Sequence, residues 1–215
     1  MSRFLILLGG DLVRTPRLDA QASGARVVAA DSGIRHAHAL GVEPELWVGD
    51  FDSAGSSLEA AFPGVPREIF PAGKDRTDGE LAVEAALSRG ATDLVLAGAF
   101  GGPRADHAHL NLVLALSLAE RGIPVLLSSG AQEGVPLLPG TSLFDYVPGT
   151  LFSVLGFSEL TGLSIAGATW PLDGVVVPFG SSLTISNEVD GRLAIDLGTG
   201  RALLLAHPYP DPNAF

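Results

Sequence analysis

Residues 94–121 read LVLAGAFGGPRADHAHLNLVLALSLAER, and this stretch decides the fold class. It begins with a short apolar run, which is typical of a strand covered on both faces of a sheet. A glycine-rich loop follows, and apolar residues then recur at helical spacing as far as Arg121. A strand, a loop and a helix in this order predict one unit of an open, mostly parallel α/β sheet with right-handed crossovers.

Four other apolar runs in the first 130 residues predict further strands of this sheet. They are residues 4–8, 27–30, 46–48 and 125–128. A second helix is expected from Gly79 to Arg89, because Thr77 and Glu80 have the spacing of a capping box. We also expect Asp106 to cap the helix that runs from residue 107 to residue 121.

The character of the chain changes after about residue 135, where turn residues recur every few positions. Short apolar runs between them predict strands at residues 150–155, 175–177, 183–186, 193–197 and 202–206. This spacing is typical of an all-β sandwich or barrel-like domain. Of the thirteen basic residues, eleven precede residue 131. We therefore predict two domains, an α/β domain over 1–132 and a β-sandwich domain over 133–215, rather than one large domain.

Composition excludes several classes of protein. The net charge of −11 argues against duplex nucleic acid or an anionic membrane as the main partner. The chain contains no cysteine, so disulfides and thiolate metal sites are excluded, and we expect a reducing, cytoplasmic location. No apolar stretch approaches the roughly 18 residues that a membrane helix needs.

Polar clusters follow the predicted strands, and the sharpest is Gly49-Asp50-Phe51-Asp52-Ser53. In an extended segment, Asp50 and Asp52 would point to the same side, with Cα atoms roughly 6.5 Å apart. Two such carboxylates are suited to one Mg²⁺ ion whose shell is completed by water and phosphate oxygens. The alternative is an aspartate-rich turn with no ligand.

Asp31-Ser32-Gly33 follows the strand predicted at residues 27–30. Ligands of open α/β sheets gather beyond the carboxyl ends of the strands, so Asp31 is expected near the Asp50 and Asp52 pair. The alternative is that Asp31 caps a helix over residues 34–40. His36 and His38 on that helix are expected to face solvent.

Lys74-Asp75-Arg76-Thr77-Asp78 supplies both signs of charge at a predicted helix start, and Lys74 is the only lysine of the chain. An ammonium group binds phosphate as a compact point charge, and the free amides of a helix N-terminus favour anions at the same place. Asp75 and Asp78 could instead be ordinary acidic residues that complement the helix dipole.

The loop Gly101-Gly102-Pro103-Arg104-Ala105-Asp106-His107 combines glycines with a forked donor. Glycines permit close approach of the backbone to phosphate, and Arg104 can grip two oxygens. The alternative is a plain loop with an exposed arginine. We expect Asn111, farther along the helix, to be a polar group with its hydrogen bonds satisfied near the cleft.

In the second half of the chain, Trp170 and Ser186-Asn187-Glu188 stand out. Locally, Trp170 is expected to be a core or rim anchor and the triplet a turn, so neither indicates function unaided. Trp47 lies within a predicted strand and is expected in the core.

Taken together, these clusters resemble those of the thiamine pyrophosphokinase family. The motifs that carry the resemblance are ADSG at residues 30–33, GDFDS at 49–53, KDRTD at 74–78, GGPRADH at 101–107, WPL at 170–172, FG at 179–180 and SN at 186–187. The resemblance extends from Asp31 to about Leu205.

The resemblance implies an α/β N-terminal domain, a C-terminal β-sandwich, and a homodimer with thiamine bound between subunits. It also implies ATP and Mg²⁺, with the metal held by Asp31, Asp50, Asp52 and Asp75, and with Asp78 nearby. The nucleotide would be bound by Asp31, Ser32, Lys74, Thr77, Arg104, Asp106 and His107. The thiazolium substrate would stack on Trp170, and Ser186 with Asn187 would hold its pyrimidine.

In the implied reaction, the thiamine hydroxyl attacks the β-phosphorus of ATP in line and AMP leaves. Catalysis is then mostly positioning and charge neutralisation by Asp50, Asp52, Asp75, Lys74 and Arg104. Either Asp78 or Asp106 would accept the hydroxyl proton. Alternatives are a pyrophosphoryl transferase acting on a pterin alcohol, a metal-dependent nucleotide-sugar transferase, and a non-catalytic sensor.

Overall fold

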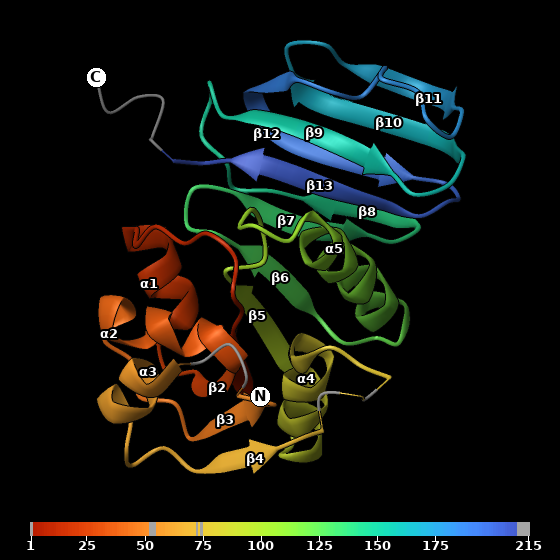
Figure 1. The fold of residues 1–215 in the computed structure, drawn as a ribbon. Coiled ribbons are helices and arrows are strands. Elements are labelled where there is room, and N and C mark those ends of the chain that lie inside the picture. The colour runs from red at the N-terminus through yellow and green to blue at the C-terminus, as the bar shows by residue number, and fades with distance from the viewer. Residues whose placement is uncertain (1, 52–54, 72, 74, 210–215) are drawn as a thin grey trace. The chain divides into compact units, whose positions relative to one another are not determined.

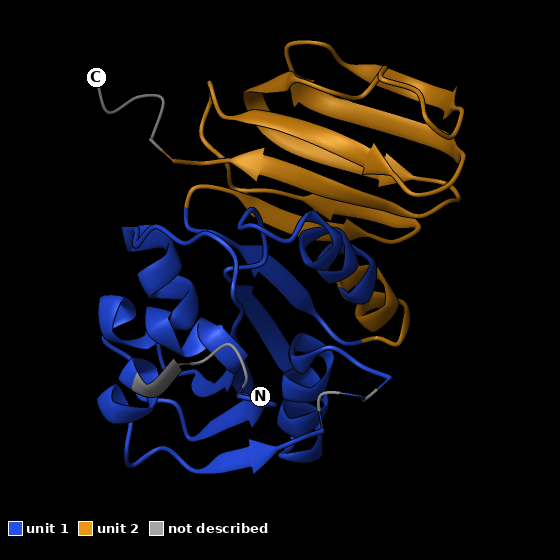
Figure 2. Ribbon diagram, in the orientation of Figure 1, with its two compact units in different colours: residues 1–114, 123–130 blue, residues 115–122, 131–215 orange. Residues whose placement is uncertain are grey.

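A computed structural model describes the chain apart from residues 1, 52–54, 72, 74 and 210–215 (Figure 1). The chain forms two compact units (Figure 2). Unit 1 comprises residues 1–114 and 123–130, and unit 2 comprises residues 115–122 and 131–215. No helix within the described ranges is long and apolar enough to cross a lipid bilayer.

Unit 1 contains a parallel sheet with the strand order β6-β5-β1-β2-β3-β4. The strands are β1 (Arg3–Leu7), β2 (Arg26–Ala30), β3 (Leu46–Gly49), β4 (Arg67–Ile69), β5 (Asp93–Ala97) and β6 (Val125–Ser128). All five predicted strands are confirmed. Strand β4 was not predicted, because it is a three-residue edge strand in which Arg67 and Glu68 leave too little apolar pattern.

Helices join the strands of unit 1. They are α1 (Pro16–Ala22), a 3₁₀ helix (Asp31–Arg35), α2 (His36–Leu40), α3 (Gly55–Ala61), α4 (Asp78–Ser88) and α5 (Ala105–Glu120). The predicted capping box is confirmed, because Thr77 accepts from the Glu80 amide while Glu80 accepts from the Thr77 amide. The prediction that Asp106 caps α5 is wrong. The helix begins at Ala105, so Asp106 lies within its first turn.

The sheet of unit 1 is covered on both faces, as the continuous apolar runs predicted. Leu5 and Leu7 of β1 face one core, which also contains Leu18 of α1, Leu40 of α2 and Trp47 of β3. Helix α4 contacts β1, β2 and β3. This arrangement leaves the ends of the strands and the loops that follow them as the polar part of the unit.

Unit 2 contains only antiparallel strand pairs. The strands are β7 (Glu133–Leu137), β8 (Gly140–Leu143), β9 (Leu151–Gly156), β10 (Leu160–Ala168), β11 (Leu172–Val177), β12 (Asn187–Leu197) and β13 (Ala202–His207). The start of β12 pairs with β9, whereas its later part pairs with β8 and β10, so this long strand takes part in two sheets.

Four of the five apolar runs predicted as strands in this region correspond to β9, β11, β12 and β13. The strand predicted at residues 183–186 is wrong, because these residues form turns. The Thr184 hydroxyl there donates to the backbone carbonyl of Val154 at 2.6 Å, which ties the turn to β9. Strands β7, β8 and β10 were not predicted, since proline and glycine interrupt their apolar pattern.

Candidate active site

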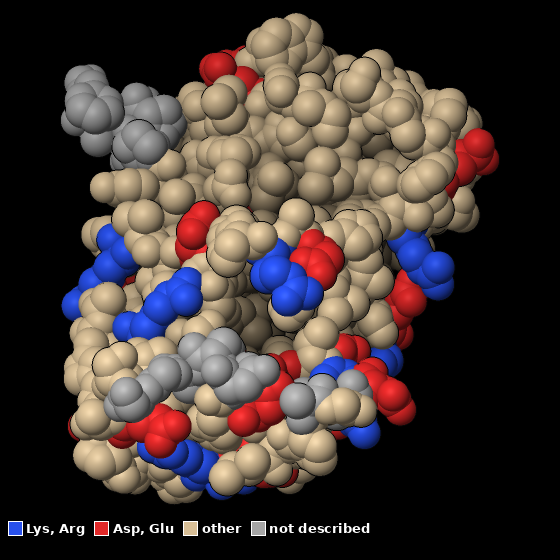
Figure 3. Space-filling model, viewed as in Figure 1, with Lys and Arg blue, Asp and Glu red and all other residues tan. Residues whose placement is uncertain are grey.

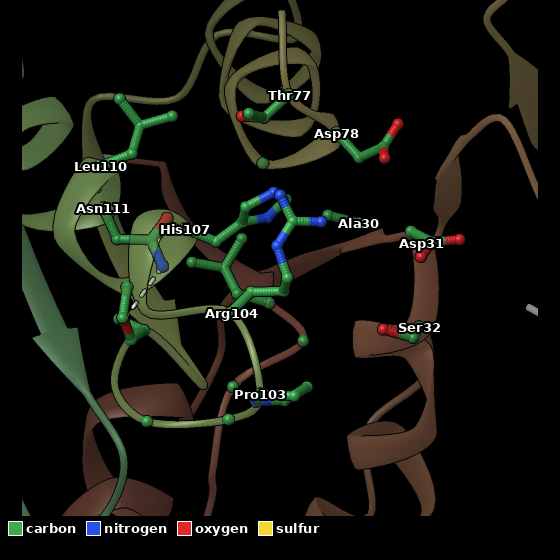
Figure 4. Close-up of a pocket in the computed structure, with 18 of the residues that line it drawn as sticks. Ala30, Asp31, Ser32, Thr77, Asp78, Pro103, Arg104, His107, Leu110 and Asn111 are labelled. Atoms are coloured by element: carbon green, nitrogen blue, oxygen red, sulfur yellow. Dashed lines mark hydrogen bonds between the residues drawn. The ribbon is translucent and has the colours of Figure 1, made fainter. Parts of the chain in front are cut away.

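A pocket of about 310 Å³ lies in unit 1, at the loops that follow β1, β2 and β5 and at the start of α4. Its volume is within the range of small-molecule sites. Loops that follow parallel strands are the usual ligand-binding edge of such a sheet. Figure 4 shows Arg104 and His107 extending into the space that is bordered by Thr77, Asp78, Asp31 and Ser32.

Two glycine turns line the pocket, and hydrogen bonds join the loops that contain them. The first is Gly9–Gly10 after β1, and the second is Gly101–Gly102 after β5. The Gly10 amide donates to the Gly98 carbonyl at 2.9 Å, and a side chain at Gly10 would clash with the carbonyls of Gly98 and Phe100. From the second turn, the Gly102 amide donates to Oδ2 of Asp11 at 3.1 Å. No local sequence pattern marks the Gly9–Gly10 turn or Asp11 as part of the pocket, since only the fold brings Asp11 to a loop 91 residues away.

Asp31 is held at the pocket in a strained backbone conformation, with φ of 42°. Its carbonyl accepts a hydrogen bond from Nε1 of Trp47 at 2.8 Å. Gly33 packs so closely under β1 that a side chain there would clash with the Leu7 carbonyl. The alternative that Asp31 caps a helix is wrong, because Asp31 is itself the first residue of the 3₁₀ helix. Trp47 is fully buried, as predicted.

Asp50 directly follows Gly49, the last residue of β3, and Gly49 contacts Asp31. A Cβ placed on Gly49 would lie 3.4 Å from the Cα and Cβ atoms of Asp31, so the ends of β2 and β3 are in contact. The expectation of an extended Asp-x-Asp segment is wrong, because Phe51 has a left-handed φ of 62°. The Phe51 ring instead packs against Trp47, with ring centroids 4.8 Å apart. Asp52 lies outside the described residues.

The start of α4 brings Thr77, Asp78 and Gly79 to the pocket. Asp75 is exposed in the preceding loop and does not line the pocket, while Lys74 lies outside the described residues. Within the described ranges, no three His, Cys, Asp or Glu side chains gather closely enough to hold a metal ion. Among the described members of the expected metal set, Asp31 lines the pocket, whereas Asp50 and Asp75 do not.

Arg104 lines the pocket and also forms an ion pair with Asp106. Its Nε donates to Oδ1 of Asp106 at 2.9 Å and its Nη2 to Oδ2 at 2.6 Å. The hydrogen bond from Arg104 is the main reason why the pKa of Asp106 lies well below its usual range. Asp106 therefore stays ionised and orients Arg104, whereas His107, one residue farther along α5, lines the pocket itself.

Asn111, which lines the pocket, and His36 each contact a backbone carbonyl. Asn111 donates to the Ala99 carbonyl at 3.0 Å, as predicted for a satisfied polar group. His38 is exposed, but the expectation that His36 faces solvent is wrong. His36 is buried, and its Nε2 lies 3.0 Å from the Gly10 carbonyl. Burial is the main reason why the pKa of His36 is lowered.

A second candidate site lies in unit 2, at Trp170, whose side chain is 59% exposed. Asn187 is buried and holds the backbone of this tryptophan from both sides. Its Oδ1 accepts from the Trp170 amide at 3.1 Å, and its Nδ2 donates to the Trp170 carbonyl at 2.8 Å. Oδ1 also accepts from the Glu188 amide at 2.8 Å, so one side-chain N–H of Asn187 remains for another partner.

Ser186 precedes Asn187 and has a left-handed φ of 62°. Its amide donates to Oγ of Ser153 at 3.0 Å, and the residue is exposed. Other exposed apolar side chains of unit 2 include Val176, Phe179, Leu183 and Ile185. In Figure 3 charged side chains gather on unit 1, whereas unit 2 carries few of them on the face shown. Such apolar exposure is typical of ligand or protein contact surfaces.

Two family models match the chain. One describes the thiamin pyrophosphokinase catalytic domain and matches residues 20–127, just over half of the chain. The other describes the thiamin pyrophosphokinase vitamin B1 binding domain and matches residues 145–203. The chain belongs to the thiamine pyrophosphokinase family. The first match contains every pocket residue from Ala30 to Asn111, and the second contains Trp170, Ser186 and Asn187.

Individual relatives agree with this assignment. Thiamine pyrophosphokinase from Bacillus subtilis (strain 168) is 29% identical over 168 residues, which cover 75% of this chain and 77% of the relative. The crystal structure of the Bacillus subtilis thiamine pyrophosphokinase has a TM-score of 0.82 at 24% identity, with 96% of this chain and 99% of that chain covered. That of thiamin pyrophosphokinase from Geobacillus thermodenitrificans has a TM-score of 0.77 at 27% identity, covering 98% and 99%.

Membership of this family favours pyrophosphoryl transfer to thiamine over the alternatives that the sequence left open. The resemblance inferred from short motifs is thus confirmed. The thirteen strands of the described residues, parallel in unit 1 and antiparallel in unit 2, match the fold of the solved relatives.

Proposed function

We propose that this chain transfers the pyrophosphoryl group of ATP to the hydroxyl of thiamine, giving thiamine diphosphate and AMP. The observation that carries the proposal is the unit 1 pocket. It combines two glycine turns, a helix start, arginine side chains and carboxylates within the segment that matches the catalytic family model. Phosphate binding needs backbone amides and forked cations in one place, and this pocket offers both.

In the proposal, Asp31, Ser32, Thr77, Arg104 and His107 bind the nucleotide. All five line the pocket, and Gly79 brings the first turn of α4, the positive end of the helix dipole, to it. Asp106 contributes by orienting Arg104 through their ion pair. Lys74 remains a proposed phosphate ligand on the grounds of sequence alone.

Mg²⁺ fits the donors at the ends of β2 and β3. Carboxylate oxygens are the ligands that this ion prefers, and Asp31 and Asp50 supply them from neighbouring strand ends. Asp52 and Asp75 are the proposed further ligands. When bound, the ion would neutralise charge on the phosphate oxygens.

Asp78 is the better candidate for the group that accepts the hydroxyl proton. It lines the pocket, whereas Asp106 does not. In addition, the lowered pKa of Asp106 makes that carboxylate a weak base. The remaining contribution of the protein is to position the attacking oxygen and the phosphorus for in-line transfer.

Thiamine is proposed to stack on Trp170, with Ser186 and the remaining N–H of Asn187 available to its pyrimidine. The exposed indole of Trp170 and the other exposed apolar side chains of unit 2 support this assignment. The same apolar surface supports a homodimer with thiamine between subunits, built through residues 133–215 arranged as a β-sandwich. A cytoplasmic location completes the proposal.

Incubation of the purified chain with thiamine, ATP and Mg²⁺ tests the function. We expect equimolar AMP and thiamine diphosphate, and loss of both products when EDTA replaces Mg²⁺. The Asp78→Asn variant should lose most turnover, whereas Asp173→Asn, a matched change at an exposed residue of β11, should not. Binding of thiamine and ATP without turnover would indicate a sensor. Turnover of a pterin alcohol or a nucleotide sugar in place of thiamine would overturn the substrate assignment.

A further inference from the structure

Arg35 lines the pocket, although the sequence patterns did not single it out. It is the last residue of the 3₁₀ helix that begins at Asp31, and its side chain is exposed on the pocket side of the loop after β2. Arg35 and Arg104 are the basic residues among the described residues that line this pocket.

One nitrogen of Arg35 holds the first glycine turn. Nη2 donates to the Gly9 carbonyl at 2.6 Å and to the Gly10 carbonyl at 3.1 Å. A guanidinium group has five N–H donors in a fixed plane, so the Nε and Nη1 donors are left for other acceptors. The glycine turn thereby fixes the position of a cation at the pocket wall.

The charge of Arg35 is not compensated by a carboxylate. Its two hydrogen bonds go to neutral carbonyls, and no acidic side chain in the described part of the chain forms an ion pair with it. Arg104 differs, because both of its bonds to Asp106 are made before any ligand enters. A fixed, forked cation without an anionic partner beside a pocket is suited to a phosphate group.

We propose that Arg35 is a further phosphate-binding residue, which anchors the Gly9–Gly10 turn with Nη2 and offers its other N–H groups to the polyphosphate of the nucleotide. The inference rests on the proposed function, because it places the nucleotide in this pocket. The same diphosphate chemistry is present in ATP and in thiamine diphosphate, and we assign Arg35 to ATP because its anchor lies in the glycine turns.

Calorimetric binding of AMP, ADP and ATP without thiamine tests the assignment. Arg35→Gln should weaken ATP binding by at least about tenfold, and AMP binding much less, since the longer phosphate chain loses a charge-assisted contact. The ATP affinity of Arg35→Lys should lie between those of the wild type and Arg35→Gln, because lysine keeps the charge but lacks the forked pair of donors. Arg121→Gln, an equal charge change at an exposed residue beyond α5, should bind all three nucleotides like the wild type.

Equal weakening of AMP and ATP by Arg35→Gln would overturn the proposal and leave Arg35 with a role in holding the turn alone. Binding of thiamine diphosphate is measured in the same way, and its weakening by Arg35→Gln with ATP binding unchanged would overturn the assignment to the nucleotide. Because these measurements need no turnover, their failure is distinct from failure of the wild-type chain to form AMP and thiamine diphosphate.

A measurement on the wild-type chain covers the case in which the variants do not fold. Arg35 should react with phenylglyoxal, as followed by mass spectrometry of peptides, and ATP or tripolyphosphate should slow this reaction whereas adenosine should not. Arg121 serves as the unprotected control in the same sample. Equal reaction of Arg35 with and without ATP would contradict the proposal.

Discussion

The two candidate sites use opposite chemistry. The pocket of unit 1 is made from charged side chains and glycine turns at the ends of parallel strands. The candidate site of unit 2 is apolar and exposed, with Trp170 in the segment that joins the antiparallel strands β10 and β11. A polyphosphate needs fixed donors and charge, whereas a flat aromatic cation needs a ring face. The division matches the proposed substrates, ATP and thiamine.

The two sites share one structural device, a non-glycine residue with left-handed backbone beside the functional side chains. Asp31 and Phe51 have this conformation in unit 1, and Ser186 has it in unit 2. Each is held by neighbours, through Trp47 for the first two and through Ser153 for the third. Strained backbone of this kind persists only where the surroundings over-determine it, which is common at functional sites. Because the two sites lie in different units, variants of the unit 1 site should change the KM for ATP, and variants of the unit 2 site should change the KM for thiamine.

The largest effect is expected from Asp50→Asn. Loss of one carboxylate from the proposed Mg²⁺ site should reduce turnover about a thousandfold or more, because charge on the phosphates is no longer neutralised. AMP release measured across a Mg²⁺ titration checks this, with circular dichroism to show an intact fold. Near-normal turnover would remove Asp50 from the metal site.

Trp170→Ala should affect thiamine and leave ATP nearly unchanged. Loss of an aromatic stacking partner costs about 1–3 kcal/mol, so the KM for thiamine should rise about fivefold to 150-fold. Trp170→Phe is the matched control and should recover most of the loss. If both substrates were affected equally, Trp170 would not be the ring platform.

Asn187→Ala should raise the KM for thiamine about fivefold to tenfold. The expected cause is indirect, because the Asn187 amide holds the backbone of Trp170 on both sides. In a double-mutant cycle, Asn187→Ala should therefore add little in a Trp170→Ala background. Full additivity would mean that Asn187 contacts thiamine itself.

Asp11→Ala should raise the KM for ATP about fivefold, since a typical intramolecular hydrogen bond contributes about 1 kcal/mol. The residue acts by holding the Gly102 amide at the pocket wall. Asp11→Asn retains an acceptor and should stay close to the wild type. A change in the KM for thiamine alone would contradict the assignment of ATP to unit 1 and thiamine to unit 2.

The smallest effect is expected from the pH dependence of stability through His36. Because burial lowers its pKa, the unfolded chain binds a proton that the folded chain does not, starting near the ordinary value of about 6.5. Stability should fall as the pH drops from about 6.5 to the lowered pKa. The charged groups acting on this histidine are Arg35 and Asp11. The free energy of unfolding of His36→Gln, measured with urea, should depend less on pH than that of the wild type. An identical pH dependence of the two proteins would exclude the effect.

Much of unit 1 could be predicted because its signals are local. Each predicted strand of unit 1 is a continuous apolar run, and the capping box of Thr77 and Glu80 needs only four residues. The short edge strand β4 and the interrupted strand β10 escaped prediction, since charged residues or glycines break their patterns. Unit 2 was less predictable because antiparallel strands with one exposed face leave a weaker apolar signal.

By itself the sequence determined the α/β-then-β order, the strands of unit 1 and the set of polar clusters that point to phosphate chemistry. Only the tertiary structure decided that Asp11 holds Gly102, that Arg35 holds the Gly9–Gly10 turn, and that Asn187 holds Trp170. Strand and helix signals arise from neighbouring residues, whereas these contacts join residues 17 to 91 positions apart. Such partners are chosen by packing of the whole chain, which no local pattern records.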